Sequence, residues 1–236
     1  MDTQIQDARL AISTARTTGI FSPAPYTITL PEKDEVPTQM AKSLFVAKIL
    51  PKIILENARI RKQREQLLSP NINPAHLNAL AKSYGVEPAG VSKTELLKRI
   101  DKIPPSLVLA QAAIESAWGT SRFARLGNAY FGERTFDLSA PGIKPLRAEG
   151  FKVKSFPSSQ MSVRSYMRTL NSHSAYKALR QHRANLRKTS QISTGIALAD
   201  HLQGYSEIGD DYIAIIKSTI QNNDFDDFDQ VKLAHD

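Results

Sequence analysis

The segment from residue 103 to residue 119 restricts the fold of this 236-residue chain more than any other. Pro104 and Pro105 stand at its start and Gly119 comes directly after it, the usual placement of proline in the first turn of a helix and of glycine just past its end. Its apolar residues fall on every face of the expected helix: Leu107, Val108, Leu109, Ala110, Ala112, Ala113, Ile114 and Ala117. A helix that is apolar all round belongs in the middle of a domain, so we expect this helix at the centre of the fold.

The only charged residue in this helix is Glu115, in its last turn. Removing an ionised carboxylate from water is costly, and the negative end of the helix dipole disfavours it further. Both effects raise the pKa of a carboxyl, as a general acid working near neutral pH requires. Glycosidases use such an acid to protonate the leaving oxygen, and Trp118 is placed to form an apolar wall beside it. The alternative is a structural ion pair between Glu115 and a base such as Arg122.

The composition excludes several kinds of chemistry. The chain has no cysteine, which rules out disulfides, thiolate nucleophiles and cysteine-bound zinc. The five histidines lack the spacing of a metal site, and serine-hydrolase and phosphate-loop motifs are absent. We therefore expect no metal and no cofactor. No apolar run is long enough to span a membrane, and no signal peptide is visible in the first residues.

The net charge of +8 is unevenly distributed. Between residues 138 and 199 the only carboxylate side chain is Glu149, whereas the same stretch holds eleven Lys and Arg residues. A basic surface favours polyanions such as nucleic acid, anionic lipid or an acidic cell-wall polymer. No nucleic-acid-binding motif accompanies the charge, so we do not expect nucleic acid as the partner, and a mildly basic protein without a polyanionic partner is the alternative.

Residues 1–103 are expected to form a helical N-terminal extension that packs on the rest of the chain. Prolines interrupt residues 1–40, where the extended run 26–30 indicates either a single edge strand or a flexible arm. Apolar residues at helical spacing predict a helix over 40–68, and Pro51 should either start a new helix or kink a long one.

Two shorter helices are predicted before the central one. The first runs over 74–84 with Asn73 as its cap, and the second over 92–100, where Ser92 and Glu95 have the spacing of a capping box.

The central helix and the later segments of the chain resemble a known family. The block IPPSLVLAQAAIESAWGTSRFA (103–124) precedes GNAYFG (127–132) and, near the end, YSE (205–207). The chain is thus similar to the peptidoglycan endo-β-N-acetylglucosaminidases, which include the glucosaminidase domain of flagellar peptidoglycan hydrolases, and is most similar to their Bax-like branch. The resemblance covers about residues 100–220, and its first block is specific.

The resemblance implies a mainly α, lysozyme-like helical domain with a small β-hairpin lobe. It also implies cleavage of the β-1,4 bond between N-acetylglucosamine and N-acetylmuramic acid, with Glu115 at the position of the general acid. Tyr205 falls where the family has a tyrosine that lines the active site, although core packing would also explain it. The residues expected to bind substrate are Gln111, Ser116, Trp118, Asn128, Tyr130, Phe131 and Tyr212.

The second catalytic group is expected in the β-lobe. A turn at Glu149-Gly150 leads into the alternating run 151–155, which favours a strand. Glu149 is the first candidate, followed by Glu133 and Asp137, and an exposed turn residue with no catalytic role is the alternative for Glu149. A distal carboxylate would act as the base in an inverting attack, whereas the acetamido group of the substrate would otherwise serve as the nucleophile.

Two alternatives keep the same fold: a lytic transglycosylase, which needs one acid and no distal carboxylate, and a non-catalytic wall-binding module. The expected organisation is a helical extension (1–103), a glucosaminidase domain (104–223) and an acidic tail (224–236). The expected partner is the peptidoglycan glycan strand, and the expected location is the periplasm or cell envelope.

Overall fold

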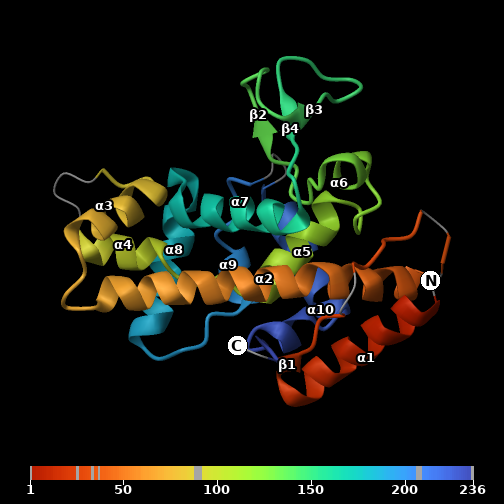
Figure 1. Cartoon of the computed structure of the whole chain (residues 1–236), viewed down its shortest axis with the longest axis horizontal. Helices are drawn as coiled ribbons and strands as arrows, with labels where there is room; N and C mark the ends of the chain where they lie inside the picture. The colour runs from red at the N-terminus through yellow and green to blue at the C-terminus, as the bar shows by residue number, and fades with distance from the viewer. Residues whose placement is uncertain are drawn as a thin grey trace.

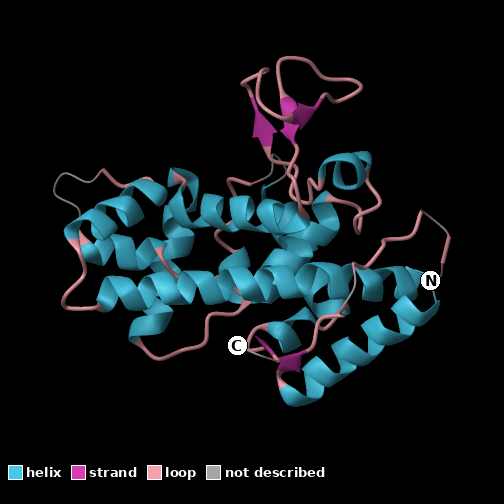
Figure 2. Ribbon diagram, viewed as in Figure 1, coloured by secondary structure: helices cyan, strands magenta, loops and turns pink. Residues whose placement is uncertain are grey.

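The chain folds into a mainly α-helical molecule in the computed structural model, which describes residues 2–24, 27–32, 35–36, 38–87, 92–205 and 209–234. Ten α-helices make up most of the described chain, and the strands are short (Figure 2). The longest helix runs along the body of the molecule, and a small sheet projects from one side (Figure 1). The predicted mainly α fold with a small β-lobe is therefore confirmed.

The apolar helix lies at the centre, as predicted. This helix, α5 (Pro105–Glu115), has residues 105–113 buried. It contacts helices from both halves of the chain: α2 (Thr38–Leu68), α9 (Gly195–Ala199), α10 (Gly209–Asn222) and the 3₁₀ helix η2 (Phe225–Phe228). Its position results from its sequence, because only the interior offers apolar partners on every side.

A residue distant in sequence holds the start of α5. Pro104, the residue before the helix, offers no side-chain cap. Instead the buried carboxylate of Asp229 accepts hydrogen bonds from the Ser106 amide (2.9 Å), the Ser106 hydroxyl (2.9 Å) and the Gly195 amide (3.2 Å). A carboxylate at a helix N-terminus satisfies a free amide and is favoured by the helix dipole. The segment expected to be an acidic tail therefore anchors the central helix.

The described part of the first 40 residues contains a helix that the sequence analysis did not predict. Helix α1 spans Asp2–Thr18 and buries Ile5, Ala8 and Ala15. Because two of these three residues are alanines, the apolar stripe of α1 is weak in the sequence. Residues 27–30 form no strand, and Tyr26 of the same run lies outside the described residues.

Helix α2 runs through Pro51 without a break. A proline in a helix interior costs about 3 kcal/mol. Each fully buried Ile or Leu contributes about 1.5–3 kcal/mol, and Ile49, Leu50 and Ile53 beside this proline are all fully buried. Packing on both sides of the proline therefore outweighs the local penalty.

The next helices begin at the predicted caps. Helix α3 (Pro74–Ser83) begins where the Asn73 side chain accepts from the Ala75 amide at 2.8 Å, and α4 (Lys93–Arg99) begins where the Ser92 hydroxyl accepts from the Glu95 amide at 3.4 Å. The remaining helices are α6 (Arg122–Gly127), α7 (Ser159–Ser172), η1 (Ser174–Tyr176) and α8 (Lys177–Lys188).

The β-lobe is a three-stranded antiparallel sheet in the order β2-β4-β3, formed by β2 (Arg134–Thr135), β3 (Gly142–Ile143) and β4 (Lys152–Lys154). It stands outside the helical body, next to α6 and α7 (Figure 1). A second pair joins the two ends of the chain, because β1 (Ile20–Phe21) runs parallel to β5 (Lys232–Leu233). Buried residues from the predicted extension, domain and tail all belong to one hydrophobic core. The division into three parts stays a prediction.

Candidate active site

The end of α5 is a sharp, unusual turn. Glu115 is the last helical residue, one turn earlier than the sequence suggested. Ala117, Trp118 and Gly119 then adopt left-handed backbone angles, with φ of 49°, 56° and 80°. Such a conformation is strained for residues other than glycine and persists only where the surroundings enforce it. The turn therefore fixes the direction of the Glu115 side chain.

Ser116 holds this turn together. Its buried hydroxyl donates to the Ala112 carbonyl at 2.6 Å and accepts from the Gly119 amide at 2.8 Å. Both bonds lie within the chain segment that carries Glu115. The structure thus gives Ser116 a position beneath the acid, with its hydroxyl already fully engaged.

The Glu115 carboxyl is half-buried and has a single strong partner. Its Oε1 accepts a hydrogen bond from the Tyr212 hydroxyl at 2.7 Å, and no ion pair among the described residues involves it. A side chain at Gly132 would place its Cβ 3.4 Å from Glu115 Oε2, so this glycine leaves room at the second oxygen. Burial raises the pKa of Glu115, and the Tyr212 hydrogen bond opposes that shift. The alternative ion pair with Arg122 is absent from the described structure.

Three buried polar groups behind Glu115 form a directed chain. The Tyr166 hydroxyl donates to Gln111 Oε1, and Gln111 Nε2 donates to the Tyr212 oxygen at 3.1 Å. Because Tyr212 accepts from Gln111, its own proton is directed to Glu115 Oε1. This order makes Oε1 the acceptor, so a proton carried by Glu115 resides on Oε2, next to Gly132. Gln111 and Tyr212, both predicted as site residues, thus meet at the acid.

Aromatic rings enclose this chain of bonds. Tyr205 stacks on Tyr212 with ring centres 5.4 Å apart, and its hydroxyl donates to the Phe131 carbonyl at 2.8 Å. Phe131 in turn stacks on Tyr166 at 4.0 Å. The predicted residues Tyr205, Phe131 and Tyr212 therefore lie in one cluster with Glu115, whereas Ser206 and Glu207 of the YSE block lie outside the described residues.

Three predicted substrate-binding residues lie elsewhere. Trp118 does not form a wall at Glu115, because its ring packs between Phe45 (5.4 Å) and Phe225 (6.0 Å). Asn128 takes the left-handed position that ends α6, and its amide donates to the Phe156 carbonyl at 3.0 Å. Tyr130 is buried against Phe45, and burial raises its pKa to about 12. The left-handed turn explains the position of the Trp118 ring, because it directs the ring towards α2 and η2.

The three candidate second carboxylates differ in their surroundings. Glu149 is exposed in the loop before β4. Glu133 comes directly after Gly132 and is largely buried; its Oε2 accepts from Ser165 (2.9 Å) and pairs with Lys154 (3.3 Å), and burial raises its pKa. Asp137 is exposed and binds the Ser139 amide and hydroxyl within its own turn.

The site contains two features that sequence reasoning missed. Tyr166 has no assigned role in the sequence pattern, although it begins the bonded chain to Glu115. Gly132 belongs to the GNAYFG motif, but the motif alone does not show that this residue leaves space at Glu115 Oε2. The spacing of Gln111 and Glu115, one helical turn apart, places a polar amide behind the acid and could have led to a polar partner such as Tyr166, whereas no signal in the sequence points to Gly132.

The described residues contain no group of three side chains placed to hold a metal ion, and no described helix is long and apolar enough to cross a membrane. Burial favours the protonated form of the Glu115 carboxyl, and the Tyr212 hydrogen bond to Oε1 favours Oε2 as the oxygen that carries the proton.

Comparison with known proteins agrees with this interpretation. The glucosaminidase family, described as mannosyl-glycoprotein endo-beta-N-acetylglucosaminidase, matches residues 92–225. Protein bax of Escherichia coli (strain K12) is 35% identical over 196 residues, which cover 77% of this chain and 69% of that protein. No solved structure matches the chain. The matched range begins at the cap of α4 and includes the whole cluster around Glu115.

Proposed function

The chain belongs to the glucosaminidase family, and on that premise we propose that it hydrolyses the β-1,4 bond between N-acetylglucosamine and N-acetylmuramic acid in peptidoglycan. Family membership supports a glycosidase that acts on a glycan. The choice of peptidoglycan and of this bond is our proposal, and it places the working protein in the periplasm or cell envelope, where that polymer lies.

The observation that carries the proposal is the state of Glu115. Its carboxyl is half-buried, has no cationic partner among the described residues, and has its pKa raised by burial. A raised pKa favours the protonated form, and a protonated carboxyl can deliver its proton to a glycosidic oxygen. Gln111, Tyr212 and Ser116 act as positioning residues in this scheme, because each fixes the acid or the residue bonded to it.

Glu149 is proposed as the second carboxylate. Its carboxylate is exposed in the loop before β4 and is therefore accessible to water. Glu133 is the second candidate: Ser165 and Lys154 bind its Oε2, whereas its buried Oε1 has no hydrogen-bond partner among the described residues. If Glu149 does not act, the acetamido group of the substrate takes the role of the nucleophile.

The first test is a zymogram on purified peptidoglycan, with native protein beside Glu115→Gln. This substitution keeps the shape of the side chain but removes the transferable proton. We expect activity to fall by about two to four orders of magnitude, as when a general acid is lost. Glu87→Gln, at an exposed position on no described pocket or bond, is the matched control and should retain native activity. Activity of Glu115→Gln within about threefold of native would remove Glu115 from the role.

The second test identifies the partner of Glu115. If Glu149 is the base, the first product formed has inverted anomeric configuration, seen by NMR immediately after cleavage, and Glu149→Gln loses about a hundredfold or more in rate. Substrate assistance predicts retained configuration and a near-native Glu149→Gln. A large loss in Glu133→Gln together with a near-native Glu149→Gln would move the base to Glu133.

Mass spectrometry of the products separates the remaining alternatives. Hydrolysis at the proposed bond gives reducing N-acetylglucosamine ends, whereas a lytic transglycosylase gives anhydromuramyl ends. A wall-binding module without catalysis gives no new ends at all. The isolated acid at Glu115 favours a catalytic protein over such a module. A buried carboxyl without a pairing cation lowers the stability of the fold, and such groups are typical of functional sites.

A further inference from the structure

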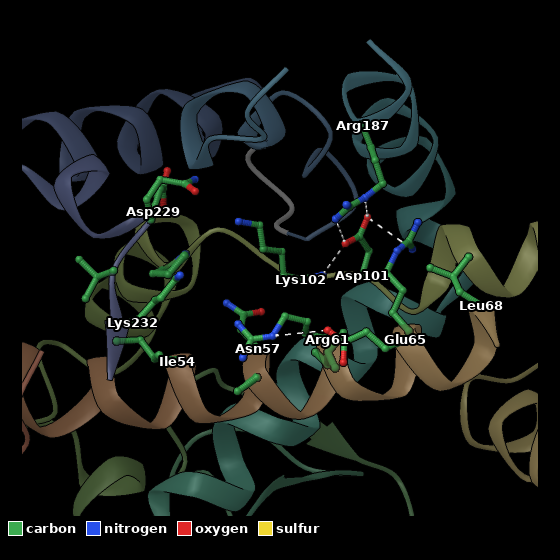
Figure 3. Close-up of a pocket in the computed structure, with 16 residues that line it drawn as sticks. Ile54, Asn57, Arg61, Glu65, Leu68, Asp101, Lys102, Arg187, Asp229 and Lys232 are labelled. Atoms are coloured by element: carbon green, nitrogen blue, oxygen red, sulfur yellow. Dashed lines mark hydrogen bonds and ion pairs between the residues drawn. The ribbon is translucent and has the colours of Figure 1, made fainter. Parts of the chain in front are cut away.

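A hollow of about 420 Å³ lies far from Glu115, on the side of α2 that faces the C-terminal segment. It is bordered by α2, by the stretch that leads into α5, by the end of α8 and by residues 229–232. In Figure 3 the Lys102 side chain lies in the middle of this hollow, with Asp101 and Arg187 on one side and Asp229 on the other. Pro105 lines it, at the opposite end of α5 from Glu115. At the usual rise of a helix these two residues are about 15 Å apart, so the hollow is separate from the candidate active site.

Cations outnumber carboxylates around the hollow. Among the described residues that line it, the cations are Arg61, Arg64, Lys102, Arg187 and Lys232, and the carboxylates are Glu65, Asp101 and Asp229. Asp229 accepts from Ser106 and Gly195 and forms no described ion pair. Glu65 pairs with Arg61 at 3.9 Å on the exposed rim. The carboxylates nearest Lys102 are therefore Asp101 on one side and Asp229 on the other.

Asp101 is shared by more guanidinium groups than it can neutralise. It is buried, accepts from Arg187 Nε at 2.7 Å, and lies 3.7 Å from Arg64 Nη1. Burial alone would raise the pKa of Asp101, but Arg183, Arg187 and Arg64 together lower it. Three guanidinium groups around Asp101 leave an excess of positive charge on this side of Lys102, and Asp229 lies on its other side. Burial and the charge of Arg187 lower the pKa of Lys102, whereas Asp101 and Asp229 oppose that shift.

A second hollow, of about 330 Å³, continues the first along α8. The two share Asp101, Lys102, Arg187 and Gln230. Arg183 lines the second hollow, is 2% exposed, and its Nε has no hydrogen-bond partner among the described residues. A buried guanidinium N–H without a partner costs free energy, but this atom is shielded from the hollow, so Arg183 contributes only its positive charge to the site.

We propose that this double hollow binds a short acidic peptide through its carboxylates. Asp101 already occupies two nitrogens of the Arg187 fork, so Lys102 and Lys232, whose ammonium groups make no described hydrogen bond or ion pair, are the cations that would meet a ligand carboxylate. Ile54, Leu68 and Val231 add an apolar wall, which a peptide can cover and a phosphate polymer would leave bare. On the proposed function, the source of such a peptide is the peptide part of peptidoglycan, and the hollow would hold the wall while the glycan is cut at Glu115.

The test measures peptide binding directly and needs no hydrolysis, so it stands apart from the proposed activity. The tripeptide alanyl-glutamyl-alanine is titrated into the full chain by calorimetry at low salt, beside alanyl-glutaminyl-alanine amide and inorganic tripolyphosphate. We expect the free acid to bind at least about tenfold more tightly than the amide, with affinity falling as salt rises.

Lys102→Glu and Lys102→Gln then locate the site, with Lys82→Glu on exposed α3 as the control of equal charge change. We expect the reversal to weaken binding at least about tenfold, the neutral variant less, and the control less than about twofold; thermal melts show whether each variant is folded. Three results would each overturn the proposal. The acid and the amide could bind equally, Lys102→Glu and Lys82→Glu could lose equal affinity, or tripolyphosphate could bind more tightly than the peptide. If thermal melts show that both Lys102 variants are unfolded, their loss of binding does not locate the site. Lys232→Glu, at the exposed edge of the same hollow, then serves as the test, and it must weaken binding if the site is real.

Discussion

At Glu115, burial and the Tyr212 hydroxyl act on the carboxyl in opposite directions. Burial is the larger influence and raises its pKa, while the hydrogen bond to Oε1 favours the ionised form and lowers it. The balance sets the pH up to which Glu115 keeps its proton. The tyrosine cluster therefore helps to set the pKa of Glu115. No tyrosine needs to ionise for this, and burial raises the pKa of Tyr166, Tyr205 and Tyr212 above the ordinary value.

Tyr212→Phe should shift the alkaline limb of the activity profile to higher pH. The substitution removes the donor that stabilises the carboxylate, so the pKa of Glu115 rises further. A general acid is active while protonated, and activity is lost as pH rises through its pKa. We expect kcat/KM at its optimum to fall by about tenfold or less, because the proton itself remains. The measurement is kcat/KM against pH on soluble peptidoglycan fragments, and an alkaline limb that moved to lower pH would contradict the directed chain from Gln111.

The residues of the site were predictable to different degrees. The lone charge in an apolar helix singled out Glu115, and the family resemblance placed Tyr205 and Tyr212 near it. Trp118 was placed at the acid because helical spacing was extended past Glu115. The left-handed turn at residues 117–119 could not be foreseen, since it depends on the buried Ser116 hydroxyl and on packing against Phe45 and Phe225.

At the level of elements, α5 shows which boundaries a sequence can predict. Its start at the prolines and its apolar faces were predictable from the sequence. Its cap is Asp229, which lies 123 positions further along the chain from Ser106. Local patterns hold no information on a partner so distant. For the same reason the acidic residues after 223 suggested a solvated tail, whereas Phe225 and Phe228 are buried beside α5.

Asp229→Ala should destabilise the protein by about 1–3 kcal/mol, because it leaves the buried amide and hydroxyl of Ser106 without an acceptor. Asp226→Ala, at an exposed acid in the same segment, is the matched control and should change stability by about 0.5 kcal/mol or less. Urea unfolding followed by circular dichroism measures both variants. Similar stability for the two would mean that the start of α5 does not depend on this carboxylate.

For the molecule as a whole, the question is whether residues 1–103 form a separable unit. The family match begins at residue 92, and the sequence suggested an extension resting on a domain. In the structure α2 contacts both α5 and α7. The buried Glu56 of α2 pairs with Arg164 of α7 at 3.0 Å, and Phe45 packs on Trp118 and Tyr130. Because α2 supplies one wall of the core, its loss would expose the apolar faces of α5 and α7, so we expect cooperative unfolding.

Scanning calorimetry of the full chain should therefore show one transition, with equal calorimetric and van't Hoff enthalpies. Phe45→Ala removes a fully buried ring from α2 and should cost about 3–5 kcal/mol. Phe45 belongs to the predicted extension and packs on Trp118 and Tyr130 of the predicted domain. The whole transition should therefore move to lower temperature without splitting. Leu55→Ala, at an exposed position on the same helix, controls for the loss of helix-surface contacts and should leave the transition nearly in place. Two transitions, of which Phe45→Ala shifts only one, would show instead that the N-terminal helices fold as an independent domain.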